Sequence, residues 1–291
     1  MSNININDYI TTGFLSKGEN PVLKVQSIIN KKEYALKKIK RSDLKSHLKD
    51  IQGLLHLVGC DHPNIIKILG FSVQQQKKEN RQEFVLFILM ECFEKNLETE
   101  IFERKNKNTY YTKDEFLNML KELLSTFLFL QNQMKIAHRD IKPANILRSN
   151  QGNLLLCDFS ESFAQTHQEA RATSIVGTPY FMAPELRELY ITSGFEDDKS
   201  YNPWKADVYS MGTTFLDCAF LSIAEKSDLK QKLLFLEKLY GKDVRDFIEI
   251  CVLSEGKERM DFEELSKCQQ YEKIFGKIKG EKEEKVMIFV L

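Results

Sequence analysis

The stretch IAHRDIKPANIL, residues 136–147, places side chains that can transfer protons or bind metal ions between apolar ends. A buried segment would not carry its charged residues without partners, because burying an unpaired charge is costly. We therefore expect a loop that is fixed at both ends by apolar contacts and presents its polar side chains to a cleft. Those side chains are His138, Arg139, Asp140, Lys142 and Asn145.

Residues 138–145 of this loop match the H-R-D-x-K-x-x-N catalytic loop of eukaryotic protein kinases. Four other segments match motifs of the same family in the same order, namely YALK at 34–37, DFS at 158–160, TPYFMAPE at 178–185 and DVYSMG at 207–212. One motif alone is weak evidence, whereas five in the right order are specific. From about residue 10 to 275 the chain therefore resembles the eukaryotic protein kinase superfamily, and Lys142 and Thr178 match its serine/threonine branch.

The resemblance implies transfer of the γ-phosphoryl group of Mg·ATP to serine and threonine hydroxyls of protein substrates. Asp140 is the expected catalytic base, and Lys142 is expected to steady the transferred phosphate. Asn145 and Asp158 are the expected Mg²⁺ ligands, because Mg²⁺ prefers hard oxygen donors. Thr178 is expected to contact Asp140 and Lys142 as a structural hydroxyl.

Lys37 is expected to hold the α- and β-phosphates of ATP. Strand alternation places Ala35, Lys37 and Ile39 on one face, so that Lys37 points inward. The family's lysine pairs with a glutamate on the following helix, but residues 41–58 contain no glutamate. We expect Asp50 to replace it, because Asp50 shares a helical stripe with leucines.

The loop that covers the phosphates departs from the family pattern G-x-G-x-x-G-x-V. Residues 15–25 read LSKGENPVLKV, and aligning Val22 with the family's valine puts Asn20 at the third glycine. One deletion then places Ser16 and Gly18 at the first two. Because glycine lets backbone N–H groups approach phosphates, we expect weaker ATP binding or slower turnover but an intact metal site.

The adenine base is expected to bind where the apolar run Phe84–Met90 ends. The resemblance makes Met90 the gatekeeper and pairs the backbone groups of Glu91 and Phe93 with the base. Met90 is also a plausible core residue, and the two roles are compatible. The other residues expected to line the nucleotide are Leu15, Ser16, Gly18, Val22, Ala35 and Leu147.

Three matched positions are expected to shape the site. Ser160 stands where the family has the glycine of D-F-G. Serine adopts a positive φ less readily than glycine, so the backbone of this segment is expected to be less mobile. We expect Asp158 to remain a metal ligand. Asp207 is expected to tie down the catalytic loop. Glu185 is expected to pair with Arg259, as the family's equivalents do.

The segment between residues 158 and 185 carries few apolar anchors and is expected to move until something orders it. Arg139 matches an arginine that many kinases use to bind a phosphate on this segment, through short charge-assisted hydrogen bonds. Ser174 is the expected phosphorylation site and Thr173 is the runner-up. The alternative is that both are ordinary loop residues.

Hydrophobic periodicity divides the chain in two. Up to about residue 90 it is strand-like, with alternating segments at Val22–Ile28 and Glu33–Ile39, one helical stretch after residue 41 and a strand region opened by HPNII at 62–66. Gln74–Gln82 is polar and is expected to be an exposed hairpin loop. Beyond residue 92, Thr112 and Glu115 form a capping box before a long amphipathic helix. Further helices are expected at about 207–223, 226–240, 243–253 and 261–275.

These elements indicate an α+β, two-lobed protein kinase fold. Residues 1–91 would form a small β-rich N-lobe with one main helix, residues 92–275 a larger, mainly α-helical C-lobe, and residues 276–291 a short tail. The tail ends in the apolar run VMIFVL, 286–291, which is expected either to pack on its own domain or to dock to a partner.

Composition excludes several function classes. Lys+Arg and Asp+Glu are both 42, so no overall charge favours nucleic acid or an anionic membrane as a partner. The longest apolar run is too short to span a bilayer, and the first residues lack a signal peptide. The six cysteines show no regular spacing, so we expect reduced thiols and a cytoplasmic or nuclear location.

The two functions left open are an active kinase and a kinase-fold interaction module with little catalysis. The module is favoured by the altered glycine loop, by Asp50 in place of glutamate and by Ser160 in place of glycine. An active enzyme is favoured because the residues needed for phosphoryl transfer are all present, namely Lys37, Asp140, Asn145 and Asp158.

Overall fold

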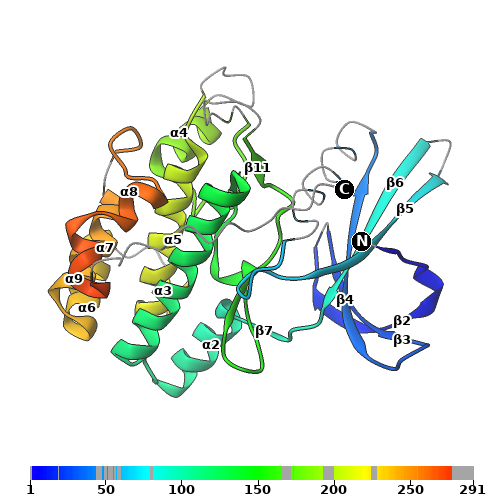
Figure 1. Cartoon of the computed structure of the whole chain (residues 1–291), viewed down its shortest axis with the longest axis horizontal. Helices are drawn as coiled ribbons and strands as arrows, with labels where there is room; N and C mark the ends of the chain where they lie inside the picture. Colours follow the sequence, from blue (N-terminus) through cyan, green and yellow to red (C-terminus); the bar gives the residue numbers. More distant parts are fainter. Residues whose placement is uncertain are drawn as a thin grey trace.

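A strand-rich part and a helical part lie side by side in the computed structural model of this chain (Figure 1). The strand-rich part comes first along the chain, in blue and cyan, and the helical part follows in green to red. This is the two-lobed α+β arrangement that the sequence predicted. The structure describes residues 2–18, 20–43, 48, 51, 55, 57, 60–78, 81–165, 172, 174–192, 200–223, 228–253 and 255–276.

The strand-rich part is a six-stranded sheet with the strand order β1-β5-β6-β4-β3-β2. Its neighbouring strands are antiparallel except β1 and β5, which are parallel. The strands expected at 22–28 and 33–39 are present, with ends that differ by one or two residues. The strands are β1 (Ser2–Asn3), β2 (Tyr9–Ser16), β3 (Val22–Ser27), β4 (Glu33–Arg41), β5 (Ile68–Lys78) and β6 (Arg81–Glu91).

Strand β6 explains the apolar run in the sequence. Val85, Phe87 and Leu89 join one apolar cluster, whereas Leu86 and Ile88 join another on the opposite face. Successive side chains of a strand point to opposite faces, so a strand covered on both faces needs a continuous apolar sequence. The prediction of a buried strand here is confirmed.

Two predictions in the strand-rich part were wrong. Most of Gln74–Gln82 is paired strand rather than loop, because β5 continues to Lys78 and β6 begins at Arg81. Ladder hydrogen bonds join backbone groups, so polar segments can pair as strands without an apolar pattern. The strand expected to open at 62–66 begins only at Ile68, and Ile65 forms an isolated bridge with Leu156.

Several predictions lie outside the described residues. These are most of the helix expected after residue 41, including Asp50, together with Thr173 and the apolar run at 286–291. From the region of the expected helix, Leu57 is described and is 6% exposed.

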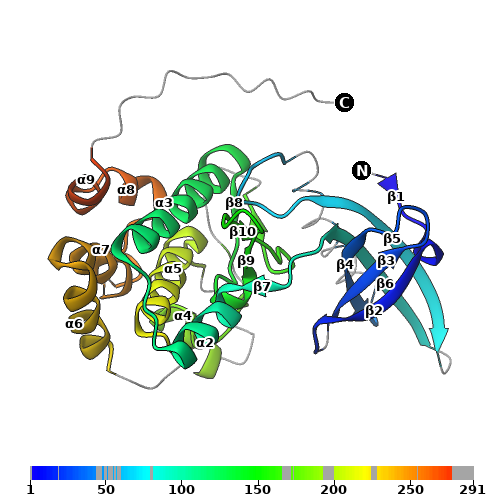
Figure 2. The same cartoon turned by 90° about the horizontal axis from the view of Figure 1, so that it is seen from below.

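The helical part is built around α5, which is buried along most of its length and packs against α6 and α7 (Figures 1 and 2). Among the described residues, no helix combines the length and apolarity that crossing a bilayer requires. The helices are α2 (Leu97–Lys107), α3 (Lys113–Phe129), α4 (Pro184–Thr192), α5 (Pro203–Phe220), α6 (Leu229–Tyr240), α7 (Lys242–Leu253), α8 (Phe262–Ser266) and α9 (Gln269–Phe275).

Helix α3 begins where the sequence predicted. The Thr112 hydroxyl accepts a hydrogen bond from the backbone N–H of Glu115 at 3.2 Å, and the Glu115 carboxylate accepts one from the backbone N–H of Thr112 at 2.7 Å. This reciprocal pair satisfies two backbone donors at the helix N-terminus. The apolar stripe of α3 is buried, with Phe116, Leu120 and Leu123 all 0% exposed.

Other helix boundaries differ from the prediction. Helix α5 starts four residues before 207, because Asn202 caps it and Pro203 fits the first helical position. The helix expected at 261–275 is interrupted after Ser266, and Cys268 caps the second piece, α9. Helix α2 was not predicted, because only two of its residues are buried and its apolar stripe is short.

Five short strands in the helical part surround the loop at 138–145. They form a three-stranded sheet of order β10-β9-β7 and a two-stranded sheet of β11 and β8. Their bounds are β7 (Lys95–Asn96), β8 (Ile136–Ala137), β9 (Ile146–Arg148), β10 (Leu154–Leu156) and β11 (Phe163–Ala164).

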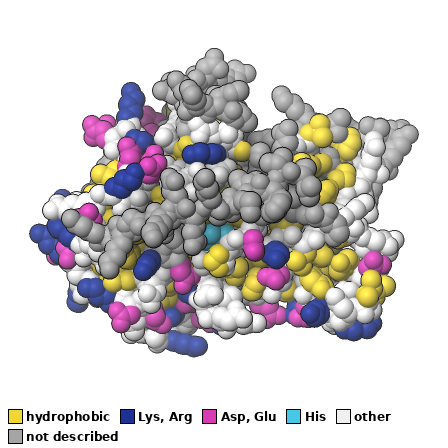
Figure 3. Space-filling view, viewed as in Figure 1, with side chains coloured by type: hydrophobic (Ala, Val, Ile, Leu, Met, Phe, Trp, Pro, Cys, Tyr) yellow, Lys and Arg dark blue, Asp and Glu magenta, His cyan; other side chains and the backbone are white. Residues whose placement is uncertain are grey.

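Basic and acidic side chains are interspersed over the helical part on the face that Figure 3 shows. This distribution agrees with the equal numbers of basic and acidic residues in the sequence.

Candidate active site

The loop at 138–145 is held at both ends by buried apolar residues. Strand β8 precedes the loop and β9 follows it. Ile136 and Ala137 are 2% and 1% exposed, and Ile146 is 0% exposed. The expected fixation of the loop by apolar contacts at both ends is confirmed.

Asp207 of α5 holds the loop through hydrogen bonds to its backbone. Its carboxylate accepts hydrogen bonds from the backbone N–H groups of His138 and Arg139, at 2.7 and 2.8 Å. Burial raises the pKa of Asp207 to about 7, although these two hydrogen bonds act in the opposite direction. Arg139 has a φ of 65°, a conformation that residues other than glycine adopt at a cost. The predicted tie between Asp207 and the loop is confirmed.

His138 connects the loop to the segment after β10. Its Nδ1 accepts a hydrogen bond from the backbone N–H of Asp140 at 3.3 Å, so the proton of a neutral ring is on Nε2. Nε2 lies 2.9 Å from the carbonyl oxygen of Cys157, to which it donates. Burial lowers the pKa of His138 and therefore favours this neutral form. His138 is thus a structural link rather than an acid–base group.

Asp140 lies at the centre of a network of polar side chains. Its Oδ1 accepts a hydrogen bond from the Thr178 hydroxyl at 2.7 Å. Its Oδ2 lies 2.8 Å from Nζ of Lys142 and accepts a hydrogen bond from the Asn145 amide at 3.0 Å. Nζ of Lys142 also donates to the Thr178 hydroxyl at 2.7 Å. The expected contacts of Thr178 with Asp140 and Lys142 are confirmed.

Asn145 and Asp158 are brought together by the pairing of β9 with β10. The backbone N–H of Cys157, one residue before Asp158, donates to the carbonyl oxygen of Asn145 at 2.9 Å. The Asn145 side chain donates through its Nδ2 to Asp140, which leaves its amide oxygen as a free acceptor among the described contacts. One amide oxygen and one carboxylate are hard donors that suit Mg²⁺, so these residues fit the ion that the sequence predicted.

Lys37, Asp158 and Ser160 form a second cluster between the two parts of the molecule. Nζ of Lys37 forms an ion pair with Oδ1 of Asp158. The Ser160 hydroxyl donates to the same oxygen at 2.6 Å and lies 3.5 Å from Nζ of Lys37. Burial would raise the pKa of Asp158, but the charge of Lys37 and these hydrogen bonds outweigh it and lower the pKa. Asp50, the expected partner of Lys37, lies outside the described residues.

The backbone explains how serine replaces glycine at position 160. The left-handed conformation of this segment is at Asp158, whose φ is 63°, and not at Ser160. Serine therefore carries no conformational penalty here.

The expected nucleotide-lining residues come from both parts of the molecule. Val22 lies opposite Lys37 and Ala35 lies opposite Met90 in the sheet. Met90 and Lys37 also line one pocket together with Asp158 and Ser160. Leu15 and Ser16 end β2, Gly18 follows them, Glu91 ends β6, Phe93 lies in the link after it, and Leu147 lies in β9.

The altered glycine loop is held by a serine. The Ser16 hydroxyl accepts a hydrogen bond from the backbone N–H of Val22 at 3.3 Å, which joins the two sides of the loop. Gly18 has a φ of 144° and no atom within 4 Å of the position of an added Cβ.

Arg139 contacts the segment that carries the predicted phosphorylation site. Its guanidinium donates to the Ser174 hydroxyl at 2.9 Å and to the Ser174 carbonyl at 3.1 Å. It also donates to the carbonyl oxygen of Glu161 at 2.6 Å. The Tyr201 hydroxyl donates to the Ser174 carbonyl at 3.1 Å, a contact that no local motif indicates.

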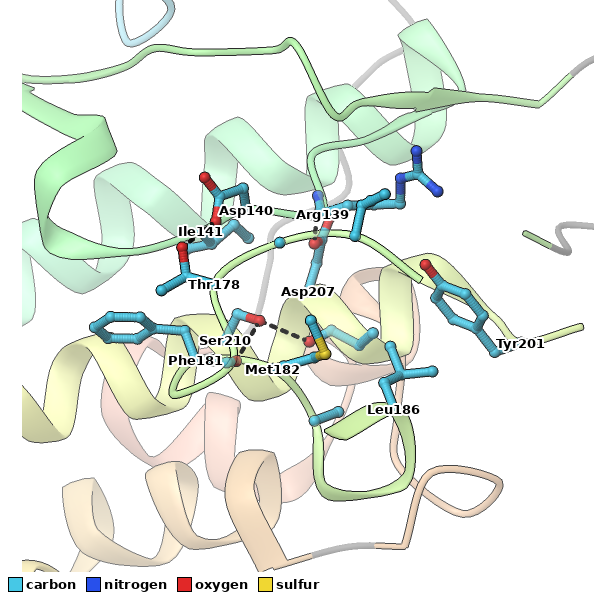
Figure 4. A pocket seen from close by; sticks show the side chains of 14 residues that line it. Arg139, Asp140, Ile141, Thr178, Phe181, Met182, Leu186, Tyr201, Asp207 and Ser210 are labelled. Atoms are coloured by element: carbon cyan, nitrogen blue, oxygen red, sulfur yellow. Dashed lines mark hydrogen bonds between the residues drawn. The ribbon is translucent and has the colours of Figure 1, made fainter. Parts of the chain in front are cut away.

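A pocket lies directly beside Asp140 and Thr178 (Figure 4). Gly177 contributes backbone to it and has a φ of 114°, and a Cβ added there would lie 2.4 Å from the carbonyl oxygen of Arg139. Only glycine fits this close approach. The apolar side of the pocket is formed by Ile141, Phe181, Met182 and Leu186.

A buried ion pair contacts Tyr180 in the segment that carries Thr178. Nζ of Lys232 lies 2.8 Å from Oδ1 of Asp217, and it donates to the Tyr180 hydroxyl at 2.8 Å. The predicted pair of Glu185 with Arg259 is also present, at 2.8 Å. Sequence analysis missed the Lys232 contacts, because its partners are 15 and 52 residues away.

Comparisons with known proteins agree with this geometry. A family model described as the protein kinase domain matches residues 15–270. Serine/threonine-protein kinase dst2 of Dictyostelium discoideum is 28% identical over 221 residues, which are 72% of this chain and 18% of that relative. The chain therefore matches only a small part of the length of this relative. Because the family model covers most of the chain, the chain belongs to the protein kinase family.

Proposed function

We propose that this protein is an ATP-dependent serine/threonine kinase that transfers the γ-phosphoryl group of Mg·ATP to hydroxyl groups of protein substrates. The observation that carries the proposal is the joint contact of Asp140 with Lys142 and Thr178. A carboxylate that is held in place by a lysine and a threonine hydroxyl is suited to orient and deprotonate an incoming hydroxyl.

Each polar residue has a role in this proposal. The substrate hydroxyl attacks the γ-phosphorus, its proton passes to the carboxylate of Asp140, and ADP leaves. Lys142, 2.8 Å from Asp140, offsets negative charge that gathers on the transferred group. Asn145 and Asp158 would hold Mg²⁺, which neutralises charge on the phosphates when it is bound. Lys37 would exchange its contact with Asp158 for the α- and β-phosphates.

The preference for serine and threonine is supported by the contact between Lys142 and Thr178 at 2.7 Å. The resemblance to serine/threonine kinases rests on these two residues, and the contact brings them together beside Asp140.

Phosphotransfer by the purified protein tests the proposal. With ATP labelled at the γ-phosphate and casein or myelin basic protein as acceptor, we expect label on serine and threonine in the presence of Mg²⁺. A chelator should abolish the labelling, because the phosphates then lack their counter-charge. Labelling of tyrosine would contradict the stated specificity. Absence of label under all conditions would favour an interaction module.

We also propose that phosphorylation of Ser174 activates the enzyme. Arg139 is 8% exposed. Among the described residues, the oxygens that accept hydrogen bonds from its guanidinium are neutral. A phosphate would give this guanidinium an anionic acceptor, and charge-assisted hydrogen bonds are stronger than those to neutral oxygens. Ser174 is itself exposed, so its hydroxyl is accessible to a modifying enzyme. A phosphate on Ser174 would pair with Arg139 and fix the segment beside Asp140.

A Ser174→Ala variant should therefore have phosphotransfer activity at least several-fold lower than the parent. A double variant that also carries Thr173→Ala should lose any remaining activity that depends on phosphate at Thr173. Mass spectrometry of the active parent should find phosphate on Ser174 or Thr173. The matched control is Ser125→Ala, because Ser125 is an exposed serine on α3. Full activity of the double variant, or an active parent without phosphate, would contradict this regulation.

A further inference from the structure

The carboxylate of Asp158 is held asymmetrically. All of its hydrogen-bond donors among the described residues reach the same oxygen, Oδ1: Nζ of Lys37, the Ser160 hydroxyl at 2.6 Å and the Ser160 backbone N–H at 3.3 Å. Among the contacts between described residues, Oδ2 accepts no hydrogen bond. One oxygen of the predicted metal ligand is therefore occupied, and the other remains as an acceptor.

The backbone around Asp158 is fixed, so the remaining freedom lies in its side chain. Asp158 adopts a φ of 63°, and the preceding residue, Cys157, is hydrogen-bonded to the carbonyl oxygen of Asn145 at 2.9 Å. The terminal torsion of an aspartate is soft and sets which way each oxygen points. A donor close in sequence can fix this torsion, and Ser160 is two residues away.

Lys37 is less suited than Ser160 to fix Asp158 during the reaction. In the proposed function, the ammonium group of Lys37 must also reach the phosphates of ATP, whose negative charge competes with the carboxylate. The Ser160 hydroxyl is neutral and local, so its bond to Oδ1 does not depend on the position of Lys37.

We propose that Ser160 is a positioning residue for the metal site: its hydroxyl holds Oδ1 of Asp158 and thereby directs Oδ2 toward the divalent ion. The inference rests on the proposed function, because it assigns Asp158 as a metal ligand. A glycine at this position has no side-chain donor, so this chain uses a hydroxyl where the family's glycine offers none. A hydroxyl that instead competed with the metal ion for the same oxygen would weaken metal binding.

Binding of Mn²⁺ distinguishes these effects without measuring activity. Mn²⁺ replaces Mg²⁺ as the probe, because the electron paramagnetic resonance signal of free Mn²⁺ decreases as the ion binds. The full chain is titrated with an equimolar non-hydrolysable ATP analogue, and Mn²⁺ binding to the analogue alone is subtracted, in the parent and in Ser160→Ala, Ser160→Gly and Ser160→Thr. Asp158→Ala serves as the variant without the metal ligand. Melting temperatures measured without ligand show that each variant is folded.

We expect Ser160→Ala and Ser160→Gly each to weaken Mn²⁺ binding about tenfold, the size of one hydrogen bond to a charged group. Ser160→Thr, which keeps a hydroxyl, should bind within about twofold of the parent. Unchanged or tighter binding in Ser160→Ala would overturn the inference, as would an equal loss in Ser160→Thr. Equal Mn²⁺ binding by the parent and by Asp158→Ala would instead contradict the proposed metal site itself.

Discussion

An Asp140→Asn variant is expected to lose about 10²- to 10⁴-fold in phosphotransfer rate, the usual contribution of a positioned general base. The variant should fold like the parent, because the amide has the same shape as the carboxylate. Its oxygen can take the place of Oδ2 and accept from Lys142 and Asn145. Its NH₂ group then faces the Thr178 hydroxyl, which can rotate to accept a hydrogen bond. The loss would therefore report the missing base and not a rearranged loop.

The rate is measured with γ-labelled ATP and Mg²⁺ at saturating concentrations of nucleotide and acceptor protein. The matched control is Asp114→Asn, the same chemical change at an exposed position in the first turn of α3. Control and parent should have the same rate, and all three proteins should show the same stabilisation by Mg·ATP in a thermal melt. A rate of Asp140→Asn within a few-fold of the parent would exclude Asp140 as the base.

A Lys232→Met variant is expected to lower the free energy of unfolding by about 3–5 kcal/mol, the cost of removing one member of a buried ion pair. The side chains of Lys232 and Asp217 are 4% and 0% exposed, and their charged atoms are 2.8 Å apart. The Tyr180 hydroxyl donates to the same carboxylate oxygen at 3.0 Å and accepts from Lys232 at 2.8 Å. Methionine fills a similar volume but removes the ammonium group that lies 2.8 Å from the carboxylate of Asp217.

Urea unfolding of the parent and the variant measures this loss. The matched control is Lys238→Met, because Lys238 is on the same helix, α6, and is exposed. It should change the free energy of unfolding by less than about 0.5 kcal/mol. A double variant with Asp217→Leu and Lys232→Met should recover part of the stability, since an apolar pair can replace a buried ion pair. A Lys232→Met variant as stable as Lys238→Met would show that the ion pair contributes nothing.

The sequence alone was sufficient for features that depend on neighbouring residues. The capping box at Thr112 was predicted because its two hydrogen bonds join residues three positions apart. The buried strand before Glu91 followed from a continuous apolar run, and the contacts of Thr178 with Asp140 and Lys142 followed from matched motifs. Family resemblance supplied these last contacts, since composition and periodicity carry no information about pairs more than 30 residues apart.

The boundaries of other elements depend on capping residues and on backbone pairing, and the apolar pattern does not predict them. The pattern at 261–275 has one helical period, but Cys268 begins a new helix after Ser266. The polar segments that end at Lys78 and begin at Arg81 are strands because their backbone groups pair with each other. Hydrophobic periodicity indicates which face of an element is buried, so it does not predict an element whose faces carry no apolar pattern.

Only the tertiary structure decided how distant side chains meet. Ser160 reaches Lys37 from a position 123 residues away, and Tyr180 meets Lys232 from 52 residues away. Each meeting requires two elements to pack in one relative position, and the apolar residues that fix this packing also fix the polar contacts. A buried charge selects its partner from the few groups that packing places within reach, because an unpaired charge would be too costly. No local pattern in the chain encodes that choice.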